Sequence, residues 1–197
     1  AFPGQAGTPS GSDTLLIDSP DTDYTTSGAT GATSYNWNIS PVAAGSISGT
    51  GTTGTVDWDN AWTGTAYITV RGVNACGSGI WSDTLTVEII SKPSVSFTGA
   101  TLSGLESVSP VQFIVNLSSA IPFDVSFDYT TADGTAINGV GNDYATAAGN
   151  ITIPAGEITD TLLVTVYEDA TEESNENFTL TLYNFVNSEA GADTVIT

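Results

Sequence analysis

Residues 111–117, Val-Gln-Phe-Ile-Val-Asn-Leu, carry apolar side chains at every second position, namely Val111, Phe113, Val115 and Leu117. Residues 125–129, Val-Ser-Phe-Asp-Tyr, repeat the same pattern. Alternation with a period of two is typical of a strand that buries one face, because successive side chains of a strand point to opposite sides. These stretches therefore predict β-structure.

The same alternation extends in both directions along the chain. It occurs at residues 95–97, 151–153, 162–166 and 178–182, and earlier at residues 35–39, 56–58, 66–70 and 85–89. Glycine-containing turn sequences separate these segments, for example residues 48–52, 132–134 and 154–156. No window has a sustained helical period, so we predict an all-β chain.

A domain boundary is predicted at Ser91-Lys92-Pro93, because proline cannot donate to a β-ladder. The charge also changes there, with 8 acidic residues in 1–91 and 14 in 92–197. Short strands at this spacing predict two tandem immunoglobulin-like β-sandwich domains, residues 1–91 and 92–197. The ends resemble those of an internal fragment, and we expect the second domain to be truncated at its C-terminal end.

The charge composition restricts the partners of the protein. The chain has 22 acidic residues against 2 basic ones, for a formal net charge of -20. Nucleic acids and anionic membranes are poor partners for such a chain, because both are bound through Lys and Arg. No apolar run is long enough to insert into a membrane. Cations are suitable partners, although the negative charge also serves solubility.

The residues needed for common catalytic sites are missing. The chain has no His and a single cysteine, Cys76. A Ser-His-Asp triad, a Cys-His pair, a zinc site and an intrachain disulfide are therefore excluded. Two carboxylates can still serve glycoside hydrolysis, but the composition favours a protein that is not an enzyme.

Acidic residues cluster after the segment 162–167, at Glu168, Asp169, Glu172, Glu173 and Glu176. Like charges about 4 Å apart repel by roughly 4 kcal/mol at an effective dielectric near 20. Solvent screening or a cation must offset that repulsion. Ca²⁺ suits such a loop, since it takes six to eight oxygen ligands in flexible geometry. The spacing leaves two alternatives, a solvated acidic loop or a calcium site.

Five short motifs follow one another along the second half: YTTADGTA at 129–136, NDY at 142–144, ITIPAGE at 151–157, VYED at 166–169 and ESNENF at 173–178. With these motifs in register, residues 93–197 resemble a Calx-beta domain over nearly their whole length. The resemblance implies a seven-strand sandwich that binds Ca²⁺ at one end.

The resemblance also implies a set of calcium ligands. By matching positions, these are Glu106, Asp143, Glu168, Asp169, Glu173 and Glu176. Glu168 departs from the family pattern, which usually has aspartate there. Asp133 lies in the neighbouring Asp-Gly turn, where it can cap the turn or bind metal.

The first half contains the segments YTTSGATGATSYNW at 24–37, GSISGTG at 45–51 and VNACG at 73–77. Through these residues it resembles PKD-like domains of large secreted surface proteins of Bacteroidetes. The resemblance implies an immunoglobulin-like spacer sandwich without catalytic residues.

Three functions remain to be compared. The first is a calcium-stabilised structural or adhesive segment of a large secreted or cell-surface protein. Its partners would be neighbouring domains of the same chain, together with surface glycans or other cells. The second is an accessory module of a secreted enzyme. The third is carbohydrate binding through Trp62 or Trp81, whereas Trp37 and Trp58 are in phase with aliphatic residues and are expected in the core.

Overall fold

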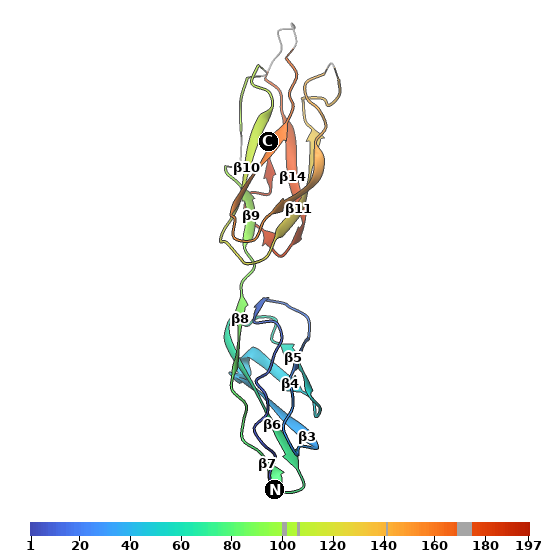
Figure 1. Cartoon of the computed structure of the whole chain (residues 1–197). Helices are drawn as coiled ribbons and strands as arrows, with labels where there is room; N and C mark the ends of the chain where they lie inside the picture. Colours follow the sequence, from blue (N-terminus) through green and yellow to red (C-terminus); the bar gives the residue numbers. More distant parts are fainter. Residues whose placement is uncertain (100–101, 106, 141, 169–174) are drawn as a thin grey trace. The chain divides into compact units, whose positions relative to one another are not determined.

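This computed structural model describes residues 1–99, 102–105, 107–140, 142–168 and 175–197. The chain divides into two compact units, Ala1–Ser91 and Lys92–Thr197 (Figure 1). Among the described residues, the single helical element is a 3-10 turn at Val42–Ala44, and none forms a helix long and apolar enough to cross a membrane. The prediction of an all-β chain with tandem β-sandwich domains is confirmed.

The first unit is formed by a larger and a smaller sheet. In the larger sheet the strand order is β1 (Thr14–Leu16), β8 (Leu85–Ile90), β6 (Gly64–Asn74) and β3 (Ser34–Ser40), and β7 (Gly77–Ser78) also pairs with β6. The smaller sheet has the order β2 (Thr22–Thr25), β5 (Thr53–Trp58) and β4 (Gly45–Ser48). Strand β1 pairs with β8 in parallel, and the other pairs are antiparallel.

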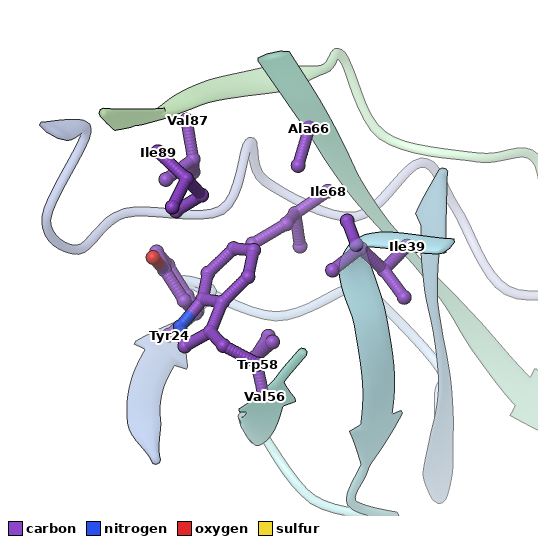
Figure 2. Packing of buried hydrophobic residues seen from close by; sticks show 9 residues of the cluster. Tyr24, Ile39, Val56, Trp58, Ala66, Ile68, Val87 and Ile89 are labelled. Carbon is purple, nitrogen blue, oxygen red and sulfur yellow. The ribbon is translucent and has the colours of Figure 1, made fainter. Parts of the chain in front are cut away.

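The core of the first unit lies between these two sheets, and Figure 2 shows its side chains converging. Trp58 packs edge-on against Tyr24, with ring centroids 6.3 Å apart, and its Nε1 donates a hydrogen bond to Thr22 Oγ1 at 3.2 Å. The Tyr24 hydroxyl donates to the Ser12 carbonyl at 3.0 Å. Burial, and secondarily the charge of Asp13, raises the pKa of Tyr24 to about 12.

The tryptophans divide between core and surface. Trp58 is buried, and Trp37 and Trp62 are partly buried against the core. Trp81 is 38% exposed. Because Trp62 packs against the core, Trp81 is the better placed of the two tryptophans that the sequence suggested for ligand stacking.

The second unit also has two sheets. One has the order β13 (Thr159–Val164), β10 (Val111–Leu117), β9 (Ser94–Phe97) and β15 (Glu189–Ala190). The other has the order β12 (Ala148–Ile153), β11 (Val125–Asp133), β14 (Phe178–Val186) and β16 (Val195–Ile196). The alternating apolar residues of the sequence form its core, namely Val95, Phe97, Phe113, Val115, Leu117, Val125, Phe127, Ile153, Leu162, Val164, Leu180 and Leu182.

Four short strands of the first unit were not among those predicted from the sequence, namely β1, β2, β4 and β7. Strands β1 and β2 were missed because each is short and β2 buries a single side chain, Tyr24. In the second unit the predicted strand 162–166 ends at Val164, and Val166 forms an isolated antiparallel bridge with Tyr144. That bridge joins the chain after β13 to the loop between β11 and β12.

Replacement of Trp58 by alanine tests the core of the first unit. The substitution removes a buried ring and its hydrogen bond, so we expect the free energy of unfolding of this unit to fall by about 3–5 kcal/mol. The exposed Trp81 is the matched control, and Trp81→Ala should cost less than about 1 kcal/mol. Denaturant unfolding followed by circular dichroism measures both, and equal losses would contradict this description of the core.

Candidate functional site

Three of the predicted metal ligands line one cavity of about 650 Å³ in the second unit: Asp143, Glu168 and Glu176. They come from separate parts of the chain. Asp143 lies in the loop between β11 and β12, Glu168 follows the Val166 bridge, and Glu176 precedes β14. The folding of the sandwich therefore brings together acids that are up to 33 residues apart in the sequence.

The other three predicted ligands, Glu106, Asp169 and Glu173, lie outside the described residues. Within the described ranges, no three His, Cys, Asp or Glu side chains lie close enough together to form a metal-binding group. Asp143, Glu168 and Glu176 therefore line the same cavity, but in the described part of the chain they do not form a compact metal-binding group.

The wall of the cavity is partly apolar, and its polar atoms are of the kind that suits a hard cation. Besides the three carboxylates, the side chains of Ser103, Ser107 and Asn175 line it. Their donor atoms are oxygens, apart from the amide nitrogen of Asn175, and oxygen is the ligand type that Ca²⁺ takes. The chain has no histidine to supply imidazole nitrogen. The donor set therefore fits Ca²⁺ and not a metal that prefers nitrogen or sulfur.

The loop that carries Asp143 is held on both sides. One carboxylate oxygen of Asp143 accepts a hydrogen bond from the Ile137 backbone N–H at 2.6 Å. The Asp143 backbone carbonyl accepts one from the Tyr167 N–H at 2.8 Å. Asp143 is therefore fixed to its own loop and to the segment that leads to Glu168.

Tyr144 anchors this loop in the core. Its side chain is 1% exposed, and its ring stacks on Phe178 with centroids 4.4 Å apart and planes 16° apart. Its hydroxyl donates a 2.6 Å hydrogen bond to Asp133 Oδ1. Burial, followed by the interaction with Asp133, raises the pKa of Tyr144 to about 12.

Asp133 serves the structure of the loop. Its carboxylate accepts hydrogen bonds from the Tyr144 hydroxyl, from the Asn138 backbone N–H at 3.0 Å, and from Asn138 Nδ2 at 2.9 Å. The bonds from Tyr144 and Asn138 lower the pKa of Asp133. Because its oxygens are occupied by these donors and it is not among the residues lining the cavity, the structure favours the capping alternative.

Asn177 joins the Glu176 segment to the loop after β11, a role that sequence reasoning missed. Its backbone N–H donates to Thr135 Oγ1 at 2.9 Å, and its carbonyl accepts from the Ala136 N–H at 2.9 Å. Its side-chain oxygen accepts from the Thr135 N–H at 3.4 Å. Thr135 and Asn177 differ by 42 in sequence number, so their pairing becomes visible only in the folded structure. Asn177 places Glu176 on the same cavity as Asp143.

The sequence model of the Calx-beta domain matches residues 88–196. The chain belongs to the Calx-beta domain family. No curated protein matches it significantly. The match does not test the PKD-like resemblance of the first unit, which stays a prediction.

Several solved structures align with this chain. The structure described as the apo-form Calx CBD1 domain has 21% identity and a TM-score of 0.49, and the alignment covers 53% of this Calx-beta chain and 93% of that one. The calcium binding domain CBD12 of CALX1.1 has 22% identity and a TM-score of 0.48, and the alignment covers 52% of this chain and 44% of that one. The FN1-FN3 domains of chicken CNTN1 have 14% identity and a TM-score of 0.43, and the alignment covers 100% of this chain and 64% of that one.

Replacement of Tyr144 by phenylalanine tests the bond to Asp133. The ring and its stacking remain, so we expect a loss of about 1 kcal/mol from the missing hydrogen bond at neutral pH. The folded pKa of Tyr144 is about 12, whereas that of an unfolded tyrosine is about 10. The Tyr144 contribution is therefore complete below the unfolded pKa and is lost as the pH rises towards the folded pKa.

The variant should accordingly lose stability less steeply than the native Calx-beta chain as the pH rises from the unfolded pKa towards the folded one. At low pH, stability changes with pH in the opposite direction. The lowered pKa of Asp133 stabilises the fold above the unfolded pKa, and that contribution is lost as the pH falls through the folded pKa. Melting temperatures measured from acid pH up to the folded pKa of Tyr144 follow both effects. Identical profiles for the two proteins would exclude a role for the Tyr144–Asp133 bond in stability.

Gly134→Ala tests the contact between the two loops. A Cβ at residue 134 would lie 2.5 Å from the Asn177 backbone oxygen, which is closer than packed atoms approach. We expect a clear fall in melting temperature, because the clash forces apart the segments that carry Asp143 and Glu176. Gly156→Ala is not a clean control, because its φ of 86° strains any side chain. A Cβ at residue 104 would meet no atom of the described residues within 4 Å, so Gly104→Ala should leave the melting temperature unchanged.

Proposed function

We propose that the second unit binds Ca²⁺ and that the protein is a calcium-stabilised structural or adhesive segment of a larger extracellular protein. The observation that carries the proposal is the convergence of Asp143, Glu168 and Glu176 on one cavity. In this proposal Glu106, Asp169 and Glu173 complete the ligand set. Membership of the Calx-beta domain family supports it.

The charge balance of the second unit supports a cation from outside the protein. Residues 92–197 contain 14 acidic residues and a single basic one, Lys92. Ion pairs within this unit therefore cannot neutralise its carboxylates. A bound Ca²⁺ removes repulsion around the cavity, and at a concentration of about 100 times its dissociation constant it adds roughly 2.7 kcal/mol of stability.

The proposed role is mechanical and not catalytic. A β-sandwich whose loops are held by a metal gives a stiff segment, and such segments suit a surface protein that extends between partners. We propose a secreted or cell-surface location, where Ca²⁺ is present at millimolar levels that weak sites can use. Neighbouring domains of the same larger chain are the proposed partners, with surface glycans or other cells as further ones.

Thermal unfolding in Ca²⁺ and in a chelator tests the calcium site. For the native chain we expect Ca²⁺ to raise the melting temperature of the second unit by about 4–8 °C for each kcal/mol gained. Two variants should lose most of this rise, Asp143→Asn and the double variant Glu173→Gln/Glu176→Gln, because both remove charged oxygen ligands.

Glu157→Gln is the matched control. Glu157 is exposed in the turn after β12 and does not line the cavity, so its variant should respond to Ca²⁺ as the native chain does. Mg²⁺ at the same concentration is a second control, since it dehydrates reluctantly and demands octahedral geometry. A rise that is equal in all variants, or absent from the native chain, would refute the proposed site.

A further inference from the structure

The outer face of the larger sheet in the first unit carries two exposed aromatic side chains and an arginine. Tyr67 and Arg71 lie on β6, where the flanking residues Ile68, Val70 and Gly72 are buried, so both side chains point away from the core. Tyr67 is 45% exposed and Trp81 is 38% exposed. The Arg71 guanidinium lies 4.4 Å from the centroid of the Trp81 ring.

Trp81 is held rigidly in this position. The Ser82 N–H donates to the Val70 carbonyl at 2.8 Å, and Ser82 Oγ accepts from the Val70 N–H at 3.1 Å. Gln5 Nε2 donates to the Trp81 carbonyl at 3.2 Å. With its backbone fixed and its ring stacked on Arg71, the indole loses little conformational freedom when a ligand binds, which favours affinity.

Polar side chains complete this face on the neighbouring strand. In the register of β3 with β6, Asn36 lies opposite Arg71, Asn38 opposite Thr69, and Ser40 opposite Tyr67. Asn36, Asn38 and Ser40 are exposed. Each amide offers both hydrogen-bond donors and an acceptor, which are the groups that sugar hydroxyls need. Aromatic rings beside exposed amides form a surface that suits the apolar faces and the polar edge of a pyranose ring.

The charge of Arg71 is unusual in this chain. It is the only arginine among 197 residues with a net charge of -20. Among the described residues, its Nε is enclosed without a hydrogen-bond acceptor. In a chain with 22 acidic residues an arginine is expected to form ion pairs, yet the guanidinium of this one lies over the Trp81 ring. The strong negative charge of the chain at the same time repels a polyanionic ligand.

We propose that this face binds a neutral oligosaccharide, with Trp81 and Tyr67 stacking on sugar rings and Arg71, Asn36 and Asn38 donating hydrogen bonds to hydroxyl oxygens. Residues 67 and 71 are four positions apart on β6, which is about 13 Å along the strand. A ligand that reaches both aromatic side chains therefore contains several sugar units, and a monosaccharide contacts only one. This site is separate from the acidic cavity and does not depend on the calcium proposal.

Binding of neutral hexasaccharides tests the proposal. The probes are cellohexaose, mannohexaose, xylohexaose and laminarihexaose, with hexagalacturonate as the acidic counterpart, measured by calorimetry and by tryptophan fluorescence in the presence of a chelator. At least one neutral probe should bind, and the affinity should fall by at least about tenfold in Trp81→Ala and in Tyr67→Ala. The corresponding monosaccharide should bind far more weakly.

Two further variants separate binding from folding. Tyr183→Ala removes a tyrosine that is 40% exposed on β14 of the second unit, and it should bind the probe as the native chain does. Trp81→Phe keeps an aromatic ring above Arg71 and should retain part of the affinity. Absence of binding by every neutral probe overturns the proposal. So does binding that survives both alanine variants, or binding of hexagalacturonate alone.

Discussion

Tyr144 connects the hydrophobic core of the second unit to the acidic wall of its cavity. Its ring stacks on Phe178, at the start of β14, and its hydroxyl holds Asp133, at the end of β11. Asp143 precedes Tyr144, and Glu176 lies two residues before Phe178. This stack of the buried Tyr144 on the partly buried Phe178 thus determines where two candidate ligands lie, so the geometry of the cavity depends on packing that a metal does not supply.

The acids of this unit divide into two kinds according to what surrounds them. The carboxylate of Asp133 is saturated by donors from Tyr144 and Asn138, and its charge is stabilised within the protein. Asp128 is held in the same way by the amides of Asn150 and Asn184, which lower its pKa. Amides and hydroxyls replace basic residues here, because the unit has one lysine. The acids Asp143, Glu168 and Glu176 differ from these two in that they line the cavity.

Much of the fold follows from alternation, because each strand of a sandwich buries every second residue. Strands with several buried side chains, such as β10 and β6, were predictable for this reason. Strand β2 was not, since Tyr24 alone faces the core and a single residue shows no period. The acidic residues were predictable from their clustering and from the Calx-beta resemblance. The role of Asn177 was not, since its partner Thr135 is 42 positions away and the bond involves main-chain atoms.

The two units show how the same excess of negative charge leads to different surfaces. In the second unit three carboxylates line one cavity, and a cation is the ligand that we propose there. In the first unit the outer face of the larger sheet presents rings and amides around Arg71, whose guanidinium lies on the Trp81 ring. An indole attracts a cation through its π face without neutralising it as a carboxylate would. Arg71 therefore keeps its charge for a ligand oxygen, while the remaining charge of the chain selects against anions. The composition that makes a metal suitable for one unit makes an uncharged ligand suitable for the other.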